Sequence, residues 1–293
     1  MTTPRSMAII GFGEVGQTFA KQFHAGGLAD IRLFDILFAD PKSIPSQAAT
    51  GPWTKSASAS EAVAGAEVVV SAVTAGSDLD AARSVLAALT PKTWFWDLNS
   101  VSPGTKREAA AIVEAGGGRY VESAVMSSIP PKGIRSPMLL GGPHAKAFIA
   151  AMAPFDLDMT FYAEEIGKAS AVKMCRSVLI KGLEALLTES MLAARHYGVE
   201  ADVLASLTDT IPHPDWTKQA GYMISRALLH GRRRAEEMRE VAKTVAEAGV
   251  APLLSAPTAE RQDWAAVEGA RIAKDLLKTP DLKRLLDELT AKS

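Results

Sequence analysis

Residues 7–20 read MAIIGFGEVGQTFA, and this stretch decides the fold. A short apolar run ends in a G-x-G-x-x-G turn, and apolar residues at helical spacing follow it, which predicts a strand, a tight turn and a helix N-terminus. In such a turn Gly11 permits the bend, Gly13 lets the backbone approach a pyrophosphate, and Gly16 lets helix and strand pack closely. The free N–H groups of the helix N-terminus then bind the anion without a basic side chain.

The residues after this turn strengthen the prediction of a dinucleotide site. Residues 31–34 (IRLF) predict a second strand, and Asp35 follows 19 positions after Gly16 (35 − 16). A carboxylate near this spacing typically binds the ribose hydroxyls, although strand-ending aspartates are also common turn residues. Because its charge would repel a 2′-phosphate, and no arginine follows within several positions, we expect NAD as the cofactor, with NADP as the alternative.

Composition limits the classes of function. The 293 residues are 47% hydrophobic and 22% charged with a net charge of −1, which is typical of a globular protein of one or two domains. This charge gives no reason to expect a nucleic-acid or membrane partner, and the run Arg232 to Arg234 is too short to change that. No apolar run approaches the roughly 20 residues of a membrane span.

The N-terminus lacks the apolar core of a signal peptide. The single cysteine, Cys175, excludes an internal disulfide and a cysteine-based metal cluster. No cluster of His, Asp and Glu has metal-ligand spacing. We therefore expect a cytoplasmic protein without a metal site.

Strand-like and helix-like segments alternate through the first part of the chain. A buried strand is expected at residues 67–73, and further strands at 93–97, 119–122, 138–140 and 159–162. Residues 39–60, rich in Ala, Ser, Pro and Thr, are expected to form a loop with short irregular pieces. This alternation predicts an α/β domain with a mostly parallel sheet covered on both faces, whose ligands bind beyond the carboxyl ends of the strands.

From Gly167 the pattern becomes helical. Residues 168–197 predict one long helix of about 45 Å, at about 1.5 Å per residue. Nearly all of the chain after it has helical period. The predicted domains are therefore a dinucleotide-binding domain at residues 1–165 and an all-helical substrate and dimerisation domain at residues 166–293.

Two polar stretches, residues 97–103 and 122–128, directly follow predicted strands. Their hydroxyl and amide groups are natural donors to a substrate carboxylate or hydroxyl. The residues expected at the cofactor are Gly11, Phe12, Gly13, Glu14, Val15, Gly16, Asp35, Val73, Thr74 and Asn99. Those expected at the substrate are Ser100, Ser123, Ala124, Val125, Met126 and Ser177.

A polar stripe runs along the long helix, because Lys173, Ser177, Lys181 and Glu184 follow one another at spacings of four, four and three. Such a stripe is more often a solvated surface than a catalytic one. A lysine beside a nicotinamide can nevertheless handle the hydroxyl proton while hydride moves, and partial burial lowers the pKa of a lysine. The pattern alone leaves both interpretations open.

The order of four motifs resembles that of the β-hydroxyacid dehydrogenase superfamily, which includes 3-hydroxyisobutyrate dehydrogenase, tartronate semialdehyde reductase and 6-phosphogluconate dehydrogenase. The motifs are the glycine turn, the two polar loops, and the G-x-x-x-x-x-K start of the long helix at residues 167–173. The resemblance implies a Rossmann-type domain joined by the long helix to an all-α domain. It also implies a homodimer joined through the helical domains, and Lys173 as the catalytic acid/base.

Three departures from the family pattern indicate a divergent branch with an atypical helical domain. Ser177 stands where the family usually has asparagine, and residues 126–128 (MSS) replace Ser-Gly-Gly. Residues 230–238 (HGRRRAEEM) stand in the region of the family's K-D-L motif. These departures leave the substrate's identity open.

Several single residues have two interpretations. His213, between two prolines, is predicted as a turn residue rather than part of an active-site cleft. His230 and Arg234 fit either an acidic substrate group or a solvated basic helix face. Cys175 is predicted to be a packed apolar side chain rather than a nucleophile.

The sequence thus predicts an NAD-dependent oxidoreductase acting on a small β-hydroxy acid or related alcohol, with Lys173 moving the proton. Two alternatives remain. One is an imine or ketone reductase of the same architecture, although those relatives commonly replace the lysine. The other is a non-catalytic NAD-binding regulator.

Overall fold

The protein is described by a computed structural model over residues 3–212 and 215–291. It forms two compact units, of which the first ends at Met174 and the second begins at Cys175. The sequence pattern puts the domain boundary at residue 165, ahead of the long helix, whereas this division falls inside that helix. The first turns of the helix belong to the first unit because Glu122 holds them through hydrogen bonds.

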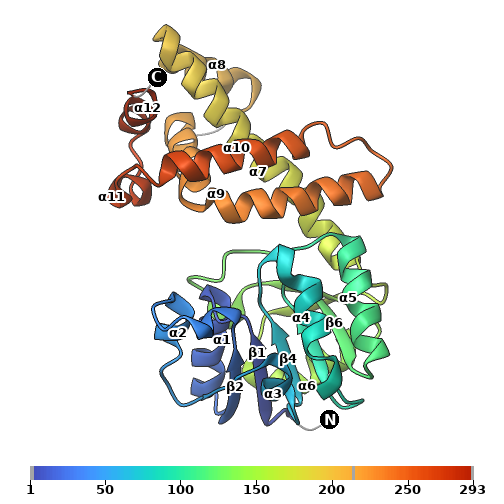
Figure 1. The fold of residues 1–293 in the computed structure, drawn as a ribbon. Helices are drawn as coiled ribbons and strands as arrows, with labels where there is room; N and C mark the ends of the chain where they lie inside the picture. Colours follow the sequence, from blue (N-terminus) through green and yellow to red (C-terminus); the bar gives the residue numbers. More distant parts are fainter. Residues whose placement is uncertain (1–2, 213–214, 292–293) are drawn as a thin grey trace. The chain divides into compact units, whose positions relative to one another are not determined.

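The first unit contains an eight-stranded sheet in the order β3-β2-β1-β4-β5-β6-β7-β8. Figure 1 labels β1, β2, β4 and β6 of this sheet. The strands are β1 Ser6–Ile10, β2 Asp30–Phe34, β3 Thr54–Lys55, β4 Val68–Ser71, β5 Trp94–Asp97, β6 Arg119–Val125, β7 Met138–Gly141 and β8 Met159–Ala163. Only the β6–β7 pair is antiparallel among these strands, and the expected mostly parallel sheet is confirmed.

Helices cover both faces of this sheet. They are α1 Glu14–Ala25, α2 Ile44–Ala48, α3 Ala59–Val63, α4 Asp78–Ser84, α5 Pro103–Ala115 and α6 Ala145–Met152. In β1, Met7 and Ile9 pack in an apolar cluster with α1 and α6, whereas Ala8 and Ile10 pack in a second cluster with α3, α4 and α5. Since successive side chains of a strand point to opposite faces, the central strands are buried on both sides.

Two segments differ from the sequence-based expectation. Residues 39–60, expected as a loop with short irregular pieces, also contain regular structure in the short helix α2 and the edge strand β3. Residues 123–125 belong to β6, because the antiparallel neighbour β7 pairs with them and extends the strand past Glu122. The sequence pattern ended the strand at Glu122, the first acidic residue.

The long helix α7 spans Lys168–Tyr197, the bounds that the sequence predicts. The helices that follow are α8 Glu200–Thr210, α9 Trp216–Glu247, α10 Ser255–Gly269, α11 Lys274–Lys278 and α12 Leu282–Thr290. The expected all-helical second part is therefore confirmed. Over residues 3–212 and 215–291, none of the helices combines the length and the apolar character that crossing a membrane requires.

Candidate functional site

The glycine turn lies between β1 and α1. Gly11 has φ +91°, and a Cβ there would clash with the carbonyl group of Ala72. A Cβ at Gly16 would clash with the carbonyl oxygen of Gly11. Gly13, the N-cap of α1, is different, because a Cβ there would meet no atom within 4 Å. The fold therefore requires glycine at positions 11 and 16, whereas the open space at Gly13 fits the close approach of a pyrophosphate.

Gly13→Ala therefore separates ligand binding from folding. We expect the free energy of unfolding to fall by no more than about 1 kcal/mol, the typical cost of replacing a favoured N-cap residue with alanine, because the added methyl group meets no clash. The Kd for NAD should rise at least about tenfold, or about 1.4 kcal/mol, because the methyl group occupies the open space. Calorimetry measures the Kd, and urea unfolding measures the stability. Gly16→Ala is the contrasting variant, which should lose stability; an unchanged Kd in Gly13→Ala would contradict the cofactor site.

Asp35 lies at the end of β2, against the glycine turn. Its carboxylate accepts hydrogen bonds from the Phe12 backbone N–H at 2.7 Å and from the Leu37 N–H at 2.8 Å. The second bond caps the 3-10 turn Ile36–Ala39. The structure thus brings Asp35 to Phe12 in the glycine turn, 23 residues away in sequence. Asp35 also acts as a turn residue, because it caps the 3-10 turn that follows it.

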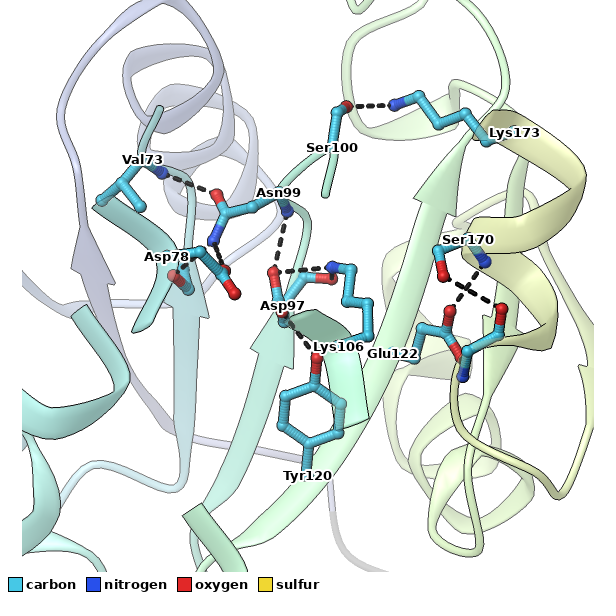
Figure 2. A network of polar contacts seen from close by, with 12 residues as sticks. Val73, Asp78, Asp97, Asn99, Ser100, Lys106, Tyr120, Glu122, Ser170 and Lys173 are labelled. Carbon is cyan, nitrogen blue, oxygen red and sulfur yellow. Dashed lines mark hydrogen bonds and ion pairs between the residues drawn. The ribbon is translucent and has the colours of Figure 1, made fainter. Parts of the chain in front are cut away.

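Asn99 connects the carboxyl ends of β4 and β5 (Figure 2). Its side-chain oxygen accepts a hydrogen bond from the Val73 N–H at 2.8 Å. Its amide nitrogen donates to Ser71 Oγ at 2.9 Å and to an oxygen of Asp78 at 2.6 Å. Asn99 is only 4% exposed, and these bonds orient the backbone at Val73, next to Thr74, where the sequence predicts the cofactor.

Asp78, in the first turn of α4, belongs to this buried network. It is 2% exposed, and its Oδ2 atom has no hydrogen-bond partner within residues 3–212 and 215–291. Burial, followed by the nearby negative charge of Asp97, raises the pKa of Asp78 to about 8. The carboxyl group of Asp78 therefore binds a proton near neutral pH.

This raised pKa makes the stability of the protein depend on pH. The native state holds the proton of Asp78 more tightly than the unfolded chain does, so the stabilisation is complete below about pH 4 and is lost as the pH rises through about 8. Each pKa unit is worth about 1.4 kcal/mol.

Asp78→Asn should therefore flatten the decline in unfolding free energy between pH 5 and pH 8 by about 1 kcal/mol or more. Urea unfolding at intervals across this range measures the decline. Asp80→Asn, an exposed change two residues further along α4, is the matched control and should leave the decline unchanged. Parallel curves for Asp78→Asn and the wild-type protein would contradict the prediction.

Asp97 is the centre of a second buried network (Figure 2). Its carboxylate forms an ion pair with Lys106 at 2.8 Å, and both side chains are fully buried. Tyr120 Oη donates to the same carboxylate at 2.6 Å, and the Asn99 N–H donates at 2.8 Å. Burial and then the charge of Asp97 raise the pKa of Tyr120 well above its usual value. The buried side chain of Asp97 therefore fixes the start of the polar loop 97–103.

Sequence reasoning missed Lys106, although α5 carries a signal for it. Lys106 falls on the same helix face as Ala109, Ala110 and Val113, all of them buried. A lysine within such an apolar stripe requires a buried partner of opposite charge. The partner, Asp97, lies directly at the end of β5.

Lys173 contacts Ser100, a residue of the polar loop 97–103 (Figure 2). Lys173 Nζ donates a hydrogen bond to Ser100 Oγ at 2.6 Å, across 73 residues of sequence. Both residues are half-buried. The structure thus places an ammonium group and a hydroxyl group together near the carboxyl end of β5, where ligands of parallel sheets bind.

Glu122 holds the start of α7, the helix that carries Lys173. Its fully buried carboxylate accepts hydrogen bonds from the backbone N–H groups of Gly167 and Ser170, both at 2.7 Å. Negative charge at a helix N-terminus is favourable. Gly141, opposite Glu122 on β7, leaves room for the carboxylate, because a Cβ there would press against it. Glu122 therefore anchors to β6 the first turn of α7, which leads to Lys173.

The other predicted substrate residues of the first unit follow Glu122. Ser123, Ala124 and Val125 are buried within β6, and Ser123 Oγ has no partner in the described part of the chain. Met126 is half-buried just after the strand, and its N–H donates to the carbonyl oxygen of Pro137. Met126 and Ser100 are therefore the more accessible of these residues.

The rest of the polar stripe on α7 is buried rather than solvated. Ser177, Lys181 and Glu184 are 8%, 7% and 2% exposed. Lys181 forms an ion pair with Glu237, and Glu184 forms one with Arg234. Ser177 Oγ accepts a hydrogen bond from Lys181 Nζ at 3.3 Å. The solvated-surface interpretation is therefore wrong for these three residues, because α9 supplies the partners of Lys181 and Glu184 and Lys181 in turn binds Ser177.

Two further predictions concern single residues. Cys175 is exposed, so the prediction of a packed apolar side chain is wrong. It follows the buried Met174 and, two positions from both Lys173 and Ser177, lies on a different face of α7 from them. His213 lies outside the described residues.

Two family models match the chain. The NAD binding domain of 6-phosphogluconate dehydrogenase matches residues 6–147, and a Domain of unknown function (DUF1932) matches residues 194–265. The first match covers the glycine turn, Asp35 and the Asn99 network. The second covers α9 and most of its neighbour α10.

Three solved structures share the fold. A conserved hypothetical protein from Sinorhizobium meliloti 1021 is 31% identical, with a TM-score of 0.73, over 98% of this chain and 97% of its own. Conserved protein MTH1747, of unknown function, is 31% identical with a TM-score of 0.67, over 90% of this chain and 99% of its own; its structure is described as similar to 3-hydroxyacid dehydrogenases. Mycobacterium tuberculosis 3-hydroxyisobutyrate dehydrogenase with L-serine is 21% identical with a TM-score of 0.67, over 99% of this chain and 100% of its own. At this identity the similarity shows a shared fold and no more.

The matches at 31% identity, over 98% and 90% of this chain, agree with the order of motifs in the sequence. The chain therefore belongs to the β-hydroxyacid dehydrogenase superfamily, in a branch that joins the NAD binding domain of 6-phosphogluconate dehydrogenase to a DUF1932 domain.

Proposed function

We propose that the protein is an NAD-dependent oxidoreductase that transfers hydride between the nicotinamide and a small β-hydroxy acid or related alcohol. The observation that carries this proposal is the hydrogen bond from Lys173 Nζ to Ser100 Oγ at 2.6 Å. It lies in the unit whose glycine turn fits a dinucleotide. A basic nitrogen and a hydroxyl in one place suit a reaction in which a proton leaves or joins a C–OH group.

When bound, the nicotinamide supplies the hydride acceptor or donor. In oxidation the neutral amine of Lys173 takes the proton of the substrate hydroxyl as the C–H bond releases its hydride. In reduction the ammonium group of Lys173 returns the proton to the forming alkoxide. Ser100 Oγ accepts a hydrogen bond from Lys173 and so orients it, while its own O–H is a donor to the substrate.

Two sets of contacts position Lys173, one at the start of its helix and one at the loop that carries its partner Ser100. Glu122 holds the first turn of α7, and the buried Asp97–Lys106 pair holds the loop that carries Ser100. Met126 and Ser177 are proposed substrate contacts. Ser177 follows Lys173 by one helical turn, about 6 Å along the axis. Ser123, Ala124 and Val125 are buried beneath Met126, and we propose that they shape the substrate site from within β6.

The preference for NAD over NADP rests on Asp35. Its carboxylate lies against the glycine turn, where it would accept hydrogen bonds from ribose hydroxyls and repel a 2′-phosphate. A ratio of kcat/KM values for the two cofactors measures the preference. Equal or higher kcat/KM with NADP would contradict it.

A panel of small β-hydroxy acids, simple alcohols and amines, offered with NAD and NADP, tests the proposal. The readout is the absorbance of reduced nicotinamide. Turnover of hydroxy acids or alcohols supports the proposal, whereas turnover of amines alone would support the imine reductase alternative. Tight NAD binding without any turnover would support the regulator.

We also propose a homodimer joined through the helical unit. Leu179 and Leu186 lie seven positions apart on α7 (186 − 179), so they share one face, and they are 70% and 63% exposed. Large exposed apolar side chains of this kind mark interaction surfaces. Light scattering at micromolar concentration should give the dimer mass, and Leu179→Glu with Leu186→Glu should give the monomer. A monomeric wild-type protein would contradict this proposal.

A further inference from the structure

One face of α9 carries four basic residues: Arg226, His230, Arg233 and Arg234. Spacings of four, three and one place them on neighbouring turns of the helix. The sequence left two interpretations open for His230 and Arg234, an acidic substrate group or a solvated basic face. Arg234 is 8% exposed and His230 is half-buried, so a solvated face does not describe them.

Carboxylates only partly balance the charge of this cluster. The two nearby acids form ion pairs across the helices and along α9: Glu184 with Arg234, and Glu237 with Lys181 and Arg233. Among the described residues, three cations that are buried or half-buried, Lys181, Arg226 and Arg234, therefore meet two carboxylates, an excess of one positive charge (3 − 2), and Arg233, 60% exposed, adds a fourth cation at the surface. A buried excess of charge is unfavourable unless an anion compensates it.

Several donors in the cluster are buried without partners. Nε of Arg226, Nε of Arg234 and Nε2 of His230 have no hydrogen-bond acceptor within residues 3–212 and 215–291. The side-chain amide of Gln262 on α10 is also without a partner in that part of the chain, and it is fully buried. Gly231 lets α10 approach α9 here, because a Cβ would clash with the Gln262 carbonyl oxygen. Buried unpaired donors of this kind indicate a missing acceptor.

The surroundings of His230 are electropositive, as expected for a site that binds an anion. Burial, followed by the charges of Arg226, Arg233 and Arg234, lowers the pKa of His230 to about 4, against a smaller opposing effect of Glu237. Its imidazole is therefore neutral at physiological pH and presents one N–H donor. Lys181 and Glu184 are the charged groups that α7 contributes to the cluster.

We propose that this cluster is an oxyanion-binding site in the second unit, which takes a carboxylate or phosphate group on Arg226, His230 and Arg234. An oxyanion offers several acceptor atoms and a negative charge, which together match the unpaired donors and the excess of positive charge. All residues of this site lie in the second unit, so anion binding there does not depend on the proposed oxidoreductase activity.

His230 provides a direct readout in the full-length protein. The ring signals of the five histidines are followed by NMR at pH 6 while inorganic phosphate or malonate is added. A bound anion raises the pKa of His230, so its signal should move saturably toward the protonated position while the other histidines do not follow. Response to phosphate alone identifies a phosphate site, and response to malonate alone identifies a carboxylate site.

Variants and salt controls keep the test decisive. Arg226→Gln removes a donor without breaking either ion pair of Glu184 or Glu237, and should weaken anion binding at least tenfold. Arg232→Gln changes an exposed arginine of the same helix and should leave the affinity unchanged. Sodium chloride at matched ionic strength should give no saturable shift. The proposal is overturned if chloride reproduces the shift, if neither anion moves the His230 signal, or if Arg226→Gln binds as the wild-type protein does.

Discussion

Replacing Lys173 with methionine should lower kcat by about 10²- to 10⁴-fold, the usual contribution of a positioned acid or base. Methionine keeps the length and apolar stem of lysine but cannot take or give a proton. The glycine turn and Asp35 are untouched, so the Kd for NAD should stay at its wild-type value. Steady-state kinetics on a substrate from the panel, with calorimetry for NAD, measures both quantities.

Lys168→Met is the matched control for this variant. Lys168 lies in the first turn of the same helix, its side chain is 55% exposed, and its partner Glu165 is also exposed. The control should keep the wild-type kcat. Near-normal turnover in Lys173→Met would contradict the proposed role, whereas loss of NAD binding would show that the variant disturbs the fold.

Replacing Lys106 with methionine should lower the free energy of unfolding by about 3–5 kcal/mol, the cost of leaving one member of a buried ion pair unpaired. The Asp97 carboxylate would keep its bonds from Tyr120 and the Asn99 N–H but lose its only cation partner in the described part of the chain. Because Asn99 and Ser100 follow Asp97, kcat/KM should fall as well. Urea unfolding followed by circular dichroism measures the stability.

Arg83→Met gives the comparison for an exposed ion pair. Arg83 pairs with Asp80 and Glu108, and all three side chains are more than half exposed. Exposed pairs contribute about 0–1 kcal/mol, so this variant should remain close to the wild-type stability. A similarly small loss in Lys106→Met would show that Asp97 does not depend on the ion pair.

The features that sequence predicted well are local or periodic. The spacing of Gly11, Gly13 and Gly16 indicates the turn because each has its own steric role within a few residues. The bounds of α7 follow from helical period and from the glycines at its two ends, Gly167 and Gly198. Alternation of apolar strands and helices predicts the parallel sheet in the same way.

The features that sequence could not predict depend on distant partners. Glu122 looks like a polar residue at a strand end, and only the fold shows that its carboxylate reaches Ser170, 48 residues later. Lys181 and Glu184 resemble a solvated stripe because their partners on α9 lie 56 and 50 residues away. The polarity of a residue in the sequence does not show whether its side chain contacts a ligand or another part of the protein.

The pH dependence of turnover in both directions tests the role of Lys173 most directly. With the wild-type enzyme, oxidation of the alcohol should accelerate as the pH rises, because it requires the neutral amine, and reduction should slow, because it requires the ammonium group. In Lys173→Met both dependences should flatten along with the loss in kcat. Identical pH profiles in the variant and the wild-type enzyme would contradict Lys173 as the residue that moves the proton.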